Sequence, residues 1–305
     1  MAPLLTRRPG RRQRRLWLTP GLASLIALAA APVLAQDPLV TPQLLISPTR
    51  LTFSETPGQG EVTLRTTGAP QTYDVLLVDR VMTPDGRILE ATDPALGPLA
   101  GPFRASARQV LSTALTTVAV SPEAGSRVRV SYAGAGGLAP GEYRTHLTFR
   151  AQPTAAAEAS APRVVFAYAI PLIVRIGAVD ARAAIEAVRL RRLSSPGAAP
   201  NAVLQTTPAL GVELVRLGSS SVFGDVEVQS LRDPAGPLLA ELRGVAVYPE
   251  VARRTLVLPL TRELGPGERV RIRYIDRDVK PGRLLADVEL APGGVQHARS
   301  DRTAP

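Results

Sequence analysis

The sequence of 305 residues contains no cysteine. Disulfide bonds, thiol catalysis, cysteine-ligated metal and a lipid attached to cysteine are therefore excluded. Small exported domains often depend on disulfides, but a chain of this length can divide into two domains that each fold on a hydrophobic core. We therefore expect a fold that is held together without covalent cross-links.

Catalytic residue types are also scarce. His146, on the polar face of a strand pattern, and His297, near the C-terminus, have no metal-ligand partner at a suitable spacing. Residues 219–221 are serines without the flanking glycines of a nucleophile elbow, and no glycine-rich phosphate loop occurs. We interpret both histidines as surface residues and expect no catalytic residue, no metal site and no cofactor.

A group of carboxylates near the C-terminus offers the one alternative. Asp276 and Asp278 flank Arg277 in a loop, and Asp287 lies on the following strand. Paired carboxylates can catalyse hydrolysis. In a hairpin loop beside arginines, a solvated turn is the preferred interpretation, so the sequence predicts a protein that is not an enzyme.

No apolar run is long enough to cross a bilayer as a helix. The run over residues 22–34 has about a dozen residues, whereas a spanning helix needs roughly 17–25. It follows six arginines, and Val33 and Ala35 fit a cleavage site. We therefore predict a signal peptide over residues 1–35 and an exported, soluble protein that is not embedded in a membrane. Residues 14–18 also resemble a twin-arginine signal, so both export routes stay open.

The charge of the mature chain is small. Without the six leader arginines, 30 basic and 26 acidic residues remain, which gives a net charge of +4. The basic residues form no block and are not interleaved with aromatic side chains. We therefore expect no nucleic-acid partner.

Short strand patterns fill the mature chain, separated by proline, glycine, aspartate and serine. The predicted strands of the first part are residues 44–53, 60–66, 73–81, 112–120, 126–133, 143–150 and 164–175. Those of the second part are residues 185–193, 211–217, 223–231, 238–247, 255–260, 268–274 and 283–290. Residues 238–242 also fit a short helix.

This pattern predicts an all-β chain of two tandem β-sandwich domains. The first domain covers residues 36–178, and the second covers residues 179–292 after a short linker candidate at 177–184. A polar, frayed tail is expected over residues 293–305.

Two neighbouring strands of the first domain differ in their patterns. Residues 143–150 alternate cleanly between apolar and polar positions, whereas residues 164–174 are apolar on both faces. An alanine-rich connector separates the two. A strand that is apolar on both faces must be covered on two sides. The core of its own domain covers only one face, so we expect a partner to cover the other.

A lone arginine interrupts the first strand. Arg50 stands in the mostly apolar run from Leu45 to Phe53. One interpretation is an edge strand whose charge points to solvent. The other is an arginine in a cleft, where the guanidinium grips a carboxylate with two parallel hydrogen bonds.

Three segments together resemble a known family. They are Ser-Pro-Thr-Arg at 47–50, Leu-x-Pro-Gly-Glu-Tyr-Arg-x-His-Leu-x-Phe-Arg at 138–150, and Ala-Ile-Pro-Leu-Ile-Val-Arg at 169–175. They resemble the PapD-like periplasmic chaperones of chaperone–usher pilus assembly, in a divergent branch. The resemblance spans most of residues 44–175 and is looser in the second domain.

This resemblance implies a fold, a function and partners. The fold would be two immunoglobulin-like β-sandwich domains. The function would be that of a non-enzymatic chaperone in the periplasm of a Gram-negative bacterium. It would bind pilus or fimbrial subunits by donor-strand complementation and deliver them to an outer-membrane usher.

The resemblance also implies site residues. The donor strand would be residues 164–170, with alternate bulky side chains inserted into the subunit, namely Val164, Phe166, Tyr168 and Ile170. The smaller Val165, Ala167 and Ala169 would face the core of the chaperone itself. Each inserted side chain of the size of Val or Phe contributes about 1.5–3 kcal/mol.

The family also anchors the C-terminal carboxylate of its subunit with two basic residues. Arg50 matches the first of them. Pro171 stands where the second, a lysine, is usual, so Arg175 is the expected substitute, with Arg163 as the other candidate. Proline donates no backbone hydrogen bond, so pairing with a subunit strand should end or be interrupted at Pro171.

An alternative is a structural pilus or cell-surface subunit built of two β-sandwich domains. Such a subunit would have an incomplete fold and a free N-terminal extension of alternating apolar residues. Residues 36–43 are short and contain proline, which argues against this alternative. The sequence does not identify the client subunit, the pilus type or the oligomeric state.

The predicted signal peptide has a direct test. The protein recovered from a periplasmic extract should begin at Gln36, because cleavage is expected after Ala35. N-terminal sequencing of that material checks the site. A full-length product that starts at Met1 and stays in the cytoplasm would contradict the prediction of export.

Overall fold

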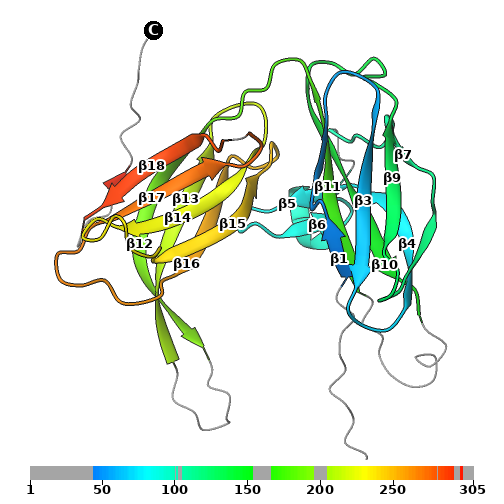
Figure 1. Cartoon of the computed structure of the whole chain (residues 1–305). Coiled ribbons are helices and arrows are strands. Elements are labelled where there is room, and N and C mark those ends of the chain that lie inside the picture. Colours follow the sequence, from blue (N-terminus) through cyan, green and yellow to red (C-terminus); the bar gives the residue numbers. More distant parts are fainter. Residues whose placement is uncertain are drawn as a thin grey trace, which may run out of the picture. The chain divides into compact units, whose positions relative to one another are not determined.

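A computed structural model describes residues 44–99, 101, 105–153, 166–195, 205–279, 281–291 and 296–297 (Figure 1). Almost all of the regular structure is β-strand, and η1 (Pro94–Leu99), a short 3-10 segment, is the only helical element of the described residues. Within these residues, no helix has the length and the apolar character that crossing a membrane requires. The prediction of an all-β chain is confirmed.

The first sandwich consists of two packed sheets. One sheet has the order β1 (Leu44–Ser47), β3 (Gly58–Thr66), β9 (Ser126–Tyr132), β7 (Leu111–Thr113). The other has the order β2 (Leu51–Phe53), β11 (Ala167–Ile176), β10 (Gly141–Ala151), β4 (Gln71–Val78), β8 (Thr117–Val120). With β1 and β2 as strand A, this is the A-B-E-D sheet facing the G-F-C sheet of an immunoglobulin-like domain.

The second sandwich consists of two sheets of four strands each. One has the order β16 (Arg253–Pro259), β13 (Gln205–Arg216), β12 (Ala183–Ser195), β19 (Gln296–His297). The other has the order β15 (Ala240–Val247), β14 (Val222–Ser230), β17 (Val270–Asp276), β18 (Leu284–Leu290). The prediction of two immunoglobulin-like sandwiches in tandem is therefore confirmed.

Alternating side chains build both cores. On β3 and β9, Val62, Leu64, Val128 and Val130 are fully buried, while the residues between them are more exposed. Because side chains of a strand alternate between its faces, this period of two places one apolar row between the sheets. Each sandwich has such a core of its own.

Several predicted elements differ from the structure. Residues 44–53 form two strands in different sheets, because the chain changes sheet between β1 and β2. The helix considered at 238–242 is wrong, because Leu242 pairs with Val226 in the ladder between β14 and β15. Cross-strand pairing here overrides the local periodicity. In the predicted tail, β19 pairs with Ala187 and Val188 of β12.

A hairpin of the first sandwich packs on the second. It consists of β5 (Arg80–Met82) and β6 (Ile88–Glu90), joined by the turn at 83–86. The turn closes with a hydrogen bond from Gly86 N to Thr83 O of 2.8 Å, and Gly86 has a φ of 85°. Met82 is 2% exposed and belongs to the core of the second sandwich. The hairpin therefore ties the two sandwiches together.

A buried ion pair adds to this connection. Arg144 on β10 is 2% exposed and donates from Nη1 to Oε2 of Glu250 over 3.0 Å and from Nη2 to Oε1 of the same carboxylate. Its Nη2 also donates to the carbonyl of Arg80 over 2.9 Å, and its Cζ lies 3.8 Å from the ring centroid of Tyr248. Glu250 Oε1 in turn accepts from Met82 N over 2.8 Å.

Replacing Glu250 by Gln should destabilise the protein strongly. The change keeps the shape but removes the negative charge that faces a buried guanidinium, and breaking a buried pair costs about 3–5 kcal/mol. Urea unfolding measures the loss in free energy of unfolding. The matched control is Glu241→Gln, which removes an exposed partner of Arg243 and should cost about 1 kcal/mol or less. Equal effects of the two changes would contradict this role of Glu250.

Candidate functional site

One side of β11 lacks a neighbouring strand along half of its length. The strand pairs with β10 from Ala167 to Ile176, but with β2 only at Leu172–Val174. Among the described residues, no strand pairs with the other side of β11 before Leu172. The last strand of this sandwich therefore has an open side next to the start of β2.

The direction of the backbone groups follows from the ladder. Ala151 N donates to Phe166 O over 2.9 Å, so the backbone of Phe166 points toward β10. Because successive residues of a strand point their N–H and C=O groups to opposite sides, those of Ala167, Ala169 and Pro171 point away from β10. We call these outward backbone groups the free edge of β11. Pro171 loses no bond to β10, which is why the strand continues through a proline.

The predicted faces of this strand are wrong. Ile170 is 4% exposed in the core of the first sandwich, and Tyr168 packs on that core, its ring 6.4 Å from that of Tyr73. Ala167 and Ala169, expected to face the core, are exposed. Whether this strand is donated to a subunit stays a prediction.

The second half of β11 shows which of its alternating side chains face the core of the first sandwich. Leu172 and Val174 are fully buried in the first sandwich, so the even-numbered positions face inward. Ile173, on the other face, is equally buried and belongs to the core of the second sandwich. The second apolar face is thus covered there by the same chain and not by a partner.

Apolar surface remains at the beginning of the strand. Phe166 is 44% exposed, and Tyr168 is only partly buried. Val164, together with Arg163 and Val165, lies outside the described residues. The free edge therefore adjoins an aromatic side chain that the described part of the chain leaves accessible.

Arg50 and Arg175 meet at one carboxylate. Arg50 places Nη1 at 3.2 Å from Oδ1 and Nη2 at 3.4 Å from Oδ2 of Asp278. Arg175 Nη1 lies 3.1 Å from the same Oδ2. The sequence paired these two arginines as a carboxylate anchor, and the structure brings them together. The carboxylate they hold is that of Asp278, which the sequence analysis expected to lie in a solvated turn.

Further contacts fix the two guanidinium groups. Arg175 Nε donates to Glu142 Oε2 over 2.9 Å, and its Nη2 donates to the carbonyl of Ser221 over 3.2 Å. Arg50 Cζ lies 4.2 Å from the ring centroid of Phe223. Burial by itself works to lower the pKa of Arg175, but Glu142 and Asp278 outweigh it and raise the pKa. These contacts hold both guanidinium groups in fixed positions, and the raised pKa keeps Arg175 a cation.

The neighbouring Asp276 also differs from the expected solvated turn. It is 4% exposed, its Oδ1 accepts from Asp278 N over 2.8 Å, and its Oδ2 accepts from Arg283 over 3.2 Å. Asp287 lies on β18 and faces Arg271 at 3.7 Å. These carboxylates each have an arginine partner, an arrangement that supports structure and not hydrolysis.

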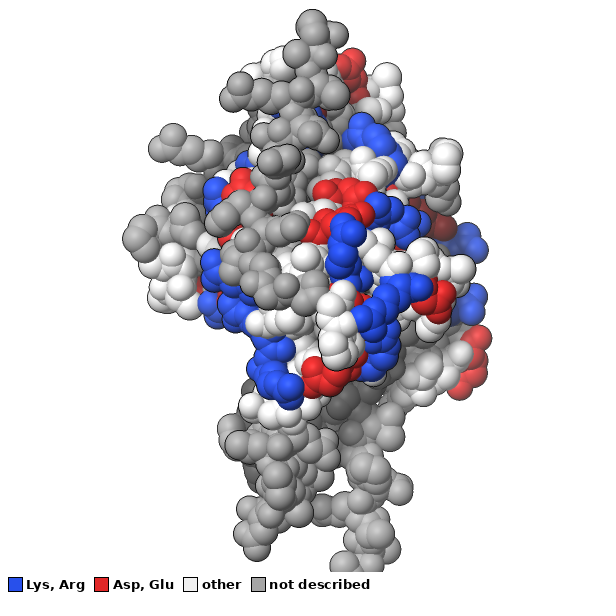
Figure 2. All heavy atoms as spheres, turned by 90° about the vertical axis from the view of Figure 1, so that its left-hand side faces the viewer, with Lys and Arg blue, Asp and Glu red and all other residues white. Residues whose placement is uncertain are grey.

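The described residues show neither a metal site nor, on the face seen in Figure 2, a continuous charged surface. The described residues contain no group of three or more His, Asp or Glu side chains that could hold a metal ion. Figure 2 shows positive and negative side chains mixed across one face of the molecule. Such mixing gives that face no continuous charged surface for an oppositely charged partner.

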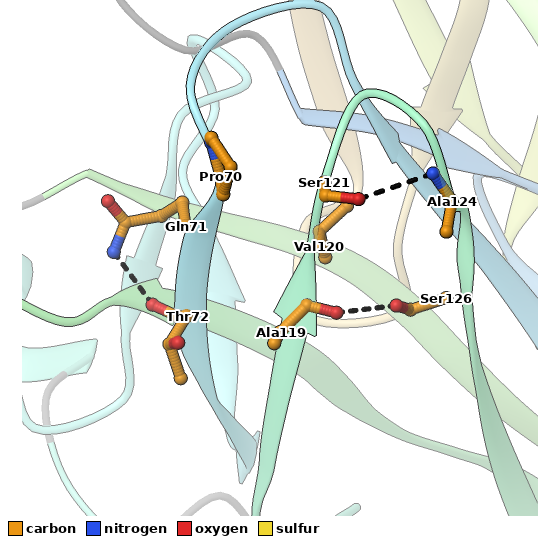
Figure 3. Close-up of a pocket in the computed structure, with 8 residues that line it drawn as sticks. All are labelled: Pro70, Gln71, Thr72, Ala119, Val120, Ser121, Ala124 and Ser126. Atoms are coloured by element: carbon orange, nitrogen blue, oxygen red, sulfur yellow. Dashed lines mark hydrogen bonds between the residues drawn. The ribbon is translucent and has the colours of Figure 1, made fainter.

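A small pocket near the start of β4 is lined by neutral groups. Its volume is about 240 Å³, and its lining residues are Pro70, Gln71, Thr72, Ala119, Val120, Ser121, Ala124 and Ser126 (Figure 3). Ser121 Oγ accepts from Ala124 N over 3.2 Å, and Ser126 Oγ donates to Ala119 O over 2.5 Å (Figure 3). With its two serine hydroxyls bonded to backbone and no acid or base in its lining, the pocket suggests no reaction.

The interpretation of His146 as a surface residue is wrong, because this side chain is buried. It is 2% exposed on β10, opposite Pro171 of β11 and Val78 of β4. Burial and the nearby cations Arg144 and Arg80 lower its pKa well below 6.5. The polar spacing of β10 misled the interpretation, because both faces of this strand are covered in the structure.

This buried histidine should make the protein sensitive to acid. Because the pKa of His146 is lower in the folded than in the unfolded chain, the unfolded chain binds more protons below about pH 6.5. Stability is then complete above that pH and falls as the pH decreases. Between pH 7.5 and pH 5, the wild type should lose about 2 kcal/mol more than His146→Gln, measured by urea unfolding. Equal losses in the two proteins would contradict this.

No family model matches the sequence, and no curated protein matches it. Among solved structures, the CupB2 chaperone of Pseudomonas aeruginosa is 16% identical with a TM-score of 0.39, over 81% of this chain and 99% of that chain. The E. coli chaperone DraB is 11% identical with a TM-score of 0.39, over 81% and 95%. A chain of the Salmonella enterica SafA pilin–SafB chaperone complex is 13% identical with a TM-score of 0.37, over 82% and 96%.

Proposed function

We propose that this chain is a periplasmic chaperone of the PapD-like, chaperone–usher type. It binds pilus or fimbrial subunits and delivers them to an outer-membrane usher. The observation that carries the proposal is the free edge of β11. The resemblance of residues 47–50, 138–150 and 169–175 to that family supports it from the sequence.

An unpaired edge is a template for another strand. Ala167 and Ala169 each offer an outward N–H and C=O, and Pro171 offers a C=O, so a partner strand can extend the sheet there. An added strand continues both faces of the sheet, so its inward side chains meet the core that Tyr168 leaves partly covered. A sandwich that lacks one strand can merge its own core with this one. Each large apolar side chain buried in this way contributes about 1.5–3 kcal/mol.

The position of the two arginines suggests the direction of the partner strand. Leu51, the first residue of β2, pairs in parallel with Leu172, so Arg50 stands where a strand alongside residues 167–171 has to end. A partner strand that runs parallel to β11 brings its C-terminus to Arg50 and Arg175. Two guanidinium groups can then bind the terminal carboxylate with charge-assisted hydrogen bonds. This supports the role of these arginines as the carboxylate anchor.

The alternative of a structural subunit fits less well. A subunit that needs a donated strand has a gap in its sandwich. In the first sandwich, the first strand of an immunoglobulin-like domain is present as β1 and β2, and the last strand is present as β11. A sandwich with its first and last strands in place can lend an edge, which favours the chaperone.

The free edge can be tested by removing one outward donor. Ala169→Pro deletes an N–H that points away from β10, as the native Pro171 already does, so the first sandwich should still fold. Capture of a partner strand should fail because a ladder bond is lost and the ring blocks the approach. The measurement is co-purification of small exported β-rich subunits encoded beside this chain, after co-expression.

The matched control is Ala169→Ser, which changes the side chain but keeps the N–H. It should capture subunits as the wild type does. Circular dichroism and melting temperature check that both variants are folded. Undiminished capture by a folded Ala169→Pro variant would overturn the strand-addition proposal.

A further inference from the structure

Asp278 sits at the point where the proposed partner places its terminal carboxylate. It belongs to the loop between β17 and β18, and its side chain faces Arg50 with both oxygens, at 3.2 Å and 3.4 Å. A terminal carboxylate has the same two-oxygen fork. The anchor therefore already holds a group of the chemistry that it is proposed to recognise.

The charges of this cluster are balanced. Arg50 and Arg175 supply two positive charges, and Glu142 and Asp278 supply two negative ones. The side chains of the two arginines are 12% and 11% exposed, so water screens the cluster little. A third carboxylate would leave an excess negative charge in a poorly solvated place, which is costly. A terminal carboxylate can therefore enter only when one of the two resident carboxylates leaves.

Asp278 is the carboxylate that can leave. The side chain of Glu142 is 1% exposed, and its Oε2 accepts from both Arg175 Nε and Ser221 N, at 2.9 Å and 3.1 Å. The side chain of Asp278 is 22% exposed. Among the described residues, its carboxylate pairs only with the two arginines that the incoming carboxylate would use. Release of Asp278 thus breaks no contact that the newcomer does not replace.

We propose that Asp278 is an internal substitute for the partner's terminal carboxylate and determines the specificity of the anchor. This inference rests on the proposed function. Asp278 keeps the anchor closed to isolated carboxylates, because the exchange of one carboxylate for another gains little by itself. Only a chain that also pairs with the free edge of β11 gains enough to displace it. Displacement also removes the ion pair between Arg50 and the second sandwich, so capture releases the loop that carries Asp278.

The test uses a defined peptide in place of the unidentified client. The peptide is fluorescein-labelled Val-Thr-Val-Tyr-Val, a strand-forming sequence matched in length to residues 167–171, made with a C-terminal carboxylate and with a C-terminal amide. Fluorescence anisotropy gives the affinity of each form. The wild type should bind the acid form only slightly more tightly than the amide form, because Asp278 has to leave first. Asp278→Asn should bind the acid form about tenfold more tightly, equal to about 1.4 kcal/mol, and the amide form unchanged.

Two controls accompany this variant. Asp287→Asn removes the same charge from an exposed pair with Arg271 on β18 and should leave both affinities unchanged. A second measurement needs no variant at all. Hydrogen–deuterium exchange of the wild type at residues 277–279 should rise with the acid peptide and not with the amide peptide, because only the acid displaces Asp278. This measurement decides the question if Asp278→Asn does not fold.

The outcomes separate this inference from the proposed function. If the wild type prefers the acid peptide but neither Asp278→Asn nor exchange at residues 277–279 changes as expected, Asp278 is not a substitute, while the anchor stands. If the acid and amide peptides bind equally in every protein, or neither binds, then Arg50 and Arg175 are no carboxylate anchor. The role of Asp278 is overturned together with it.

Discussion

The guanidinium of Arg144 is the interaction on which the arrangement of the two sandwiches depends. It is attached to the central strand β10 of one sandwich and binds Glu250 and Tyr248 of the other. A buried cation is stable only where all of its surroundings are fixed, because each lost contact leaves charge without compensation. The same carboxylate of Glu250 also holds the backbone of Met82. The hairpin of β5 and β6, the strand β10 and the second sandwich are therefore fixed by one group.

This connection has a consequence for the candidate site. Arg50 and Arg175 belong to the first sandwich, whereas Asp278 and Phe223 belong to the second. Their distances of a few ångströms exist only because the two sandwiches are held in one relation. The geometry of the proposed carboxylate anchor is thus supported from outside by the buried pair of Arg144 and Glu250.

Much of the fold could be predicted from the sequence, because alternation and turn residues carry that information locally. The strands predicted at 60–66 and 126–133, which the structure has as β3 and β9, are examples. The pairing of Arg50 with Arg175 was predicted from the family resemblance. The faces of β11 could not be predicted, because a strand that is apolar on both sides has no alternation to read. In the structure, the packing of Leu172 and Val174 in the core of the first sandwich determines which face of β11 points inward. The partner of Arg50 lies 228 residues away, and no local pattern reports such a contact.

The position of Pro171 also affects where a strand added to β11 can form backbone hydrogen bonds. The outward backbone groups comprise two donors and three acceptors, since Ala167 and Ala169 supply both kinds and Pro171 only an acceptor. An added strand that continued past Pro171 would place an acceptor opposite the missing N–H of the proline. The main chain of β11 therefore limits how far an added strand can pair, and this limit does not depend on the side chains of that strand. If β11 binds a partner strand as proposed, it sets this limit while tolerating many ligand sequences.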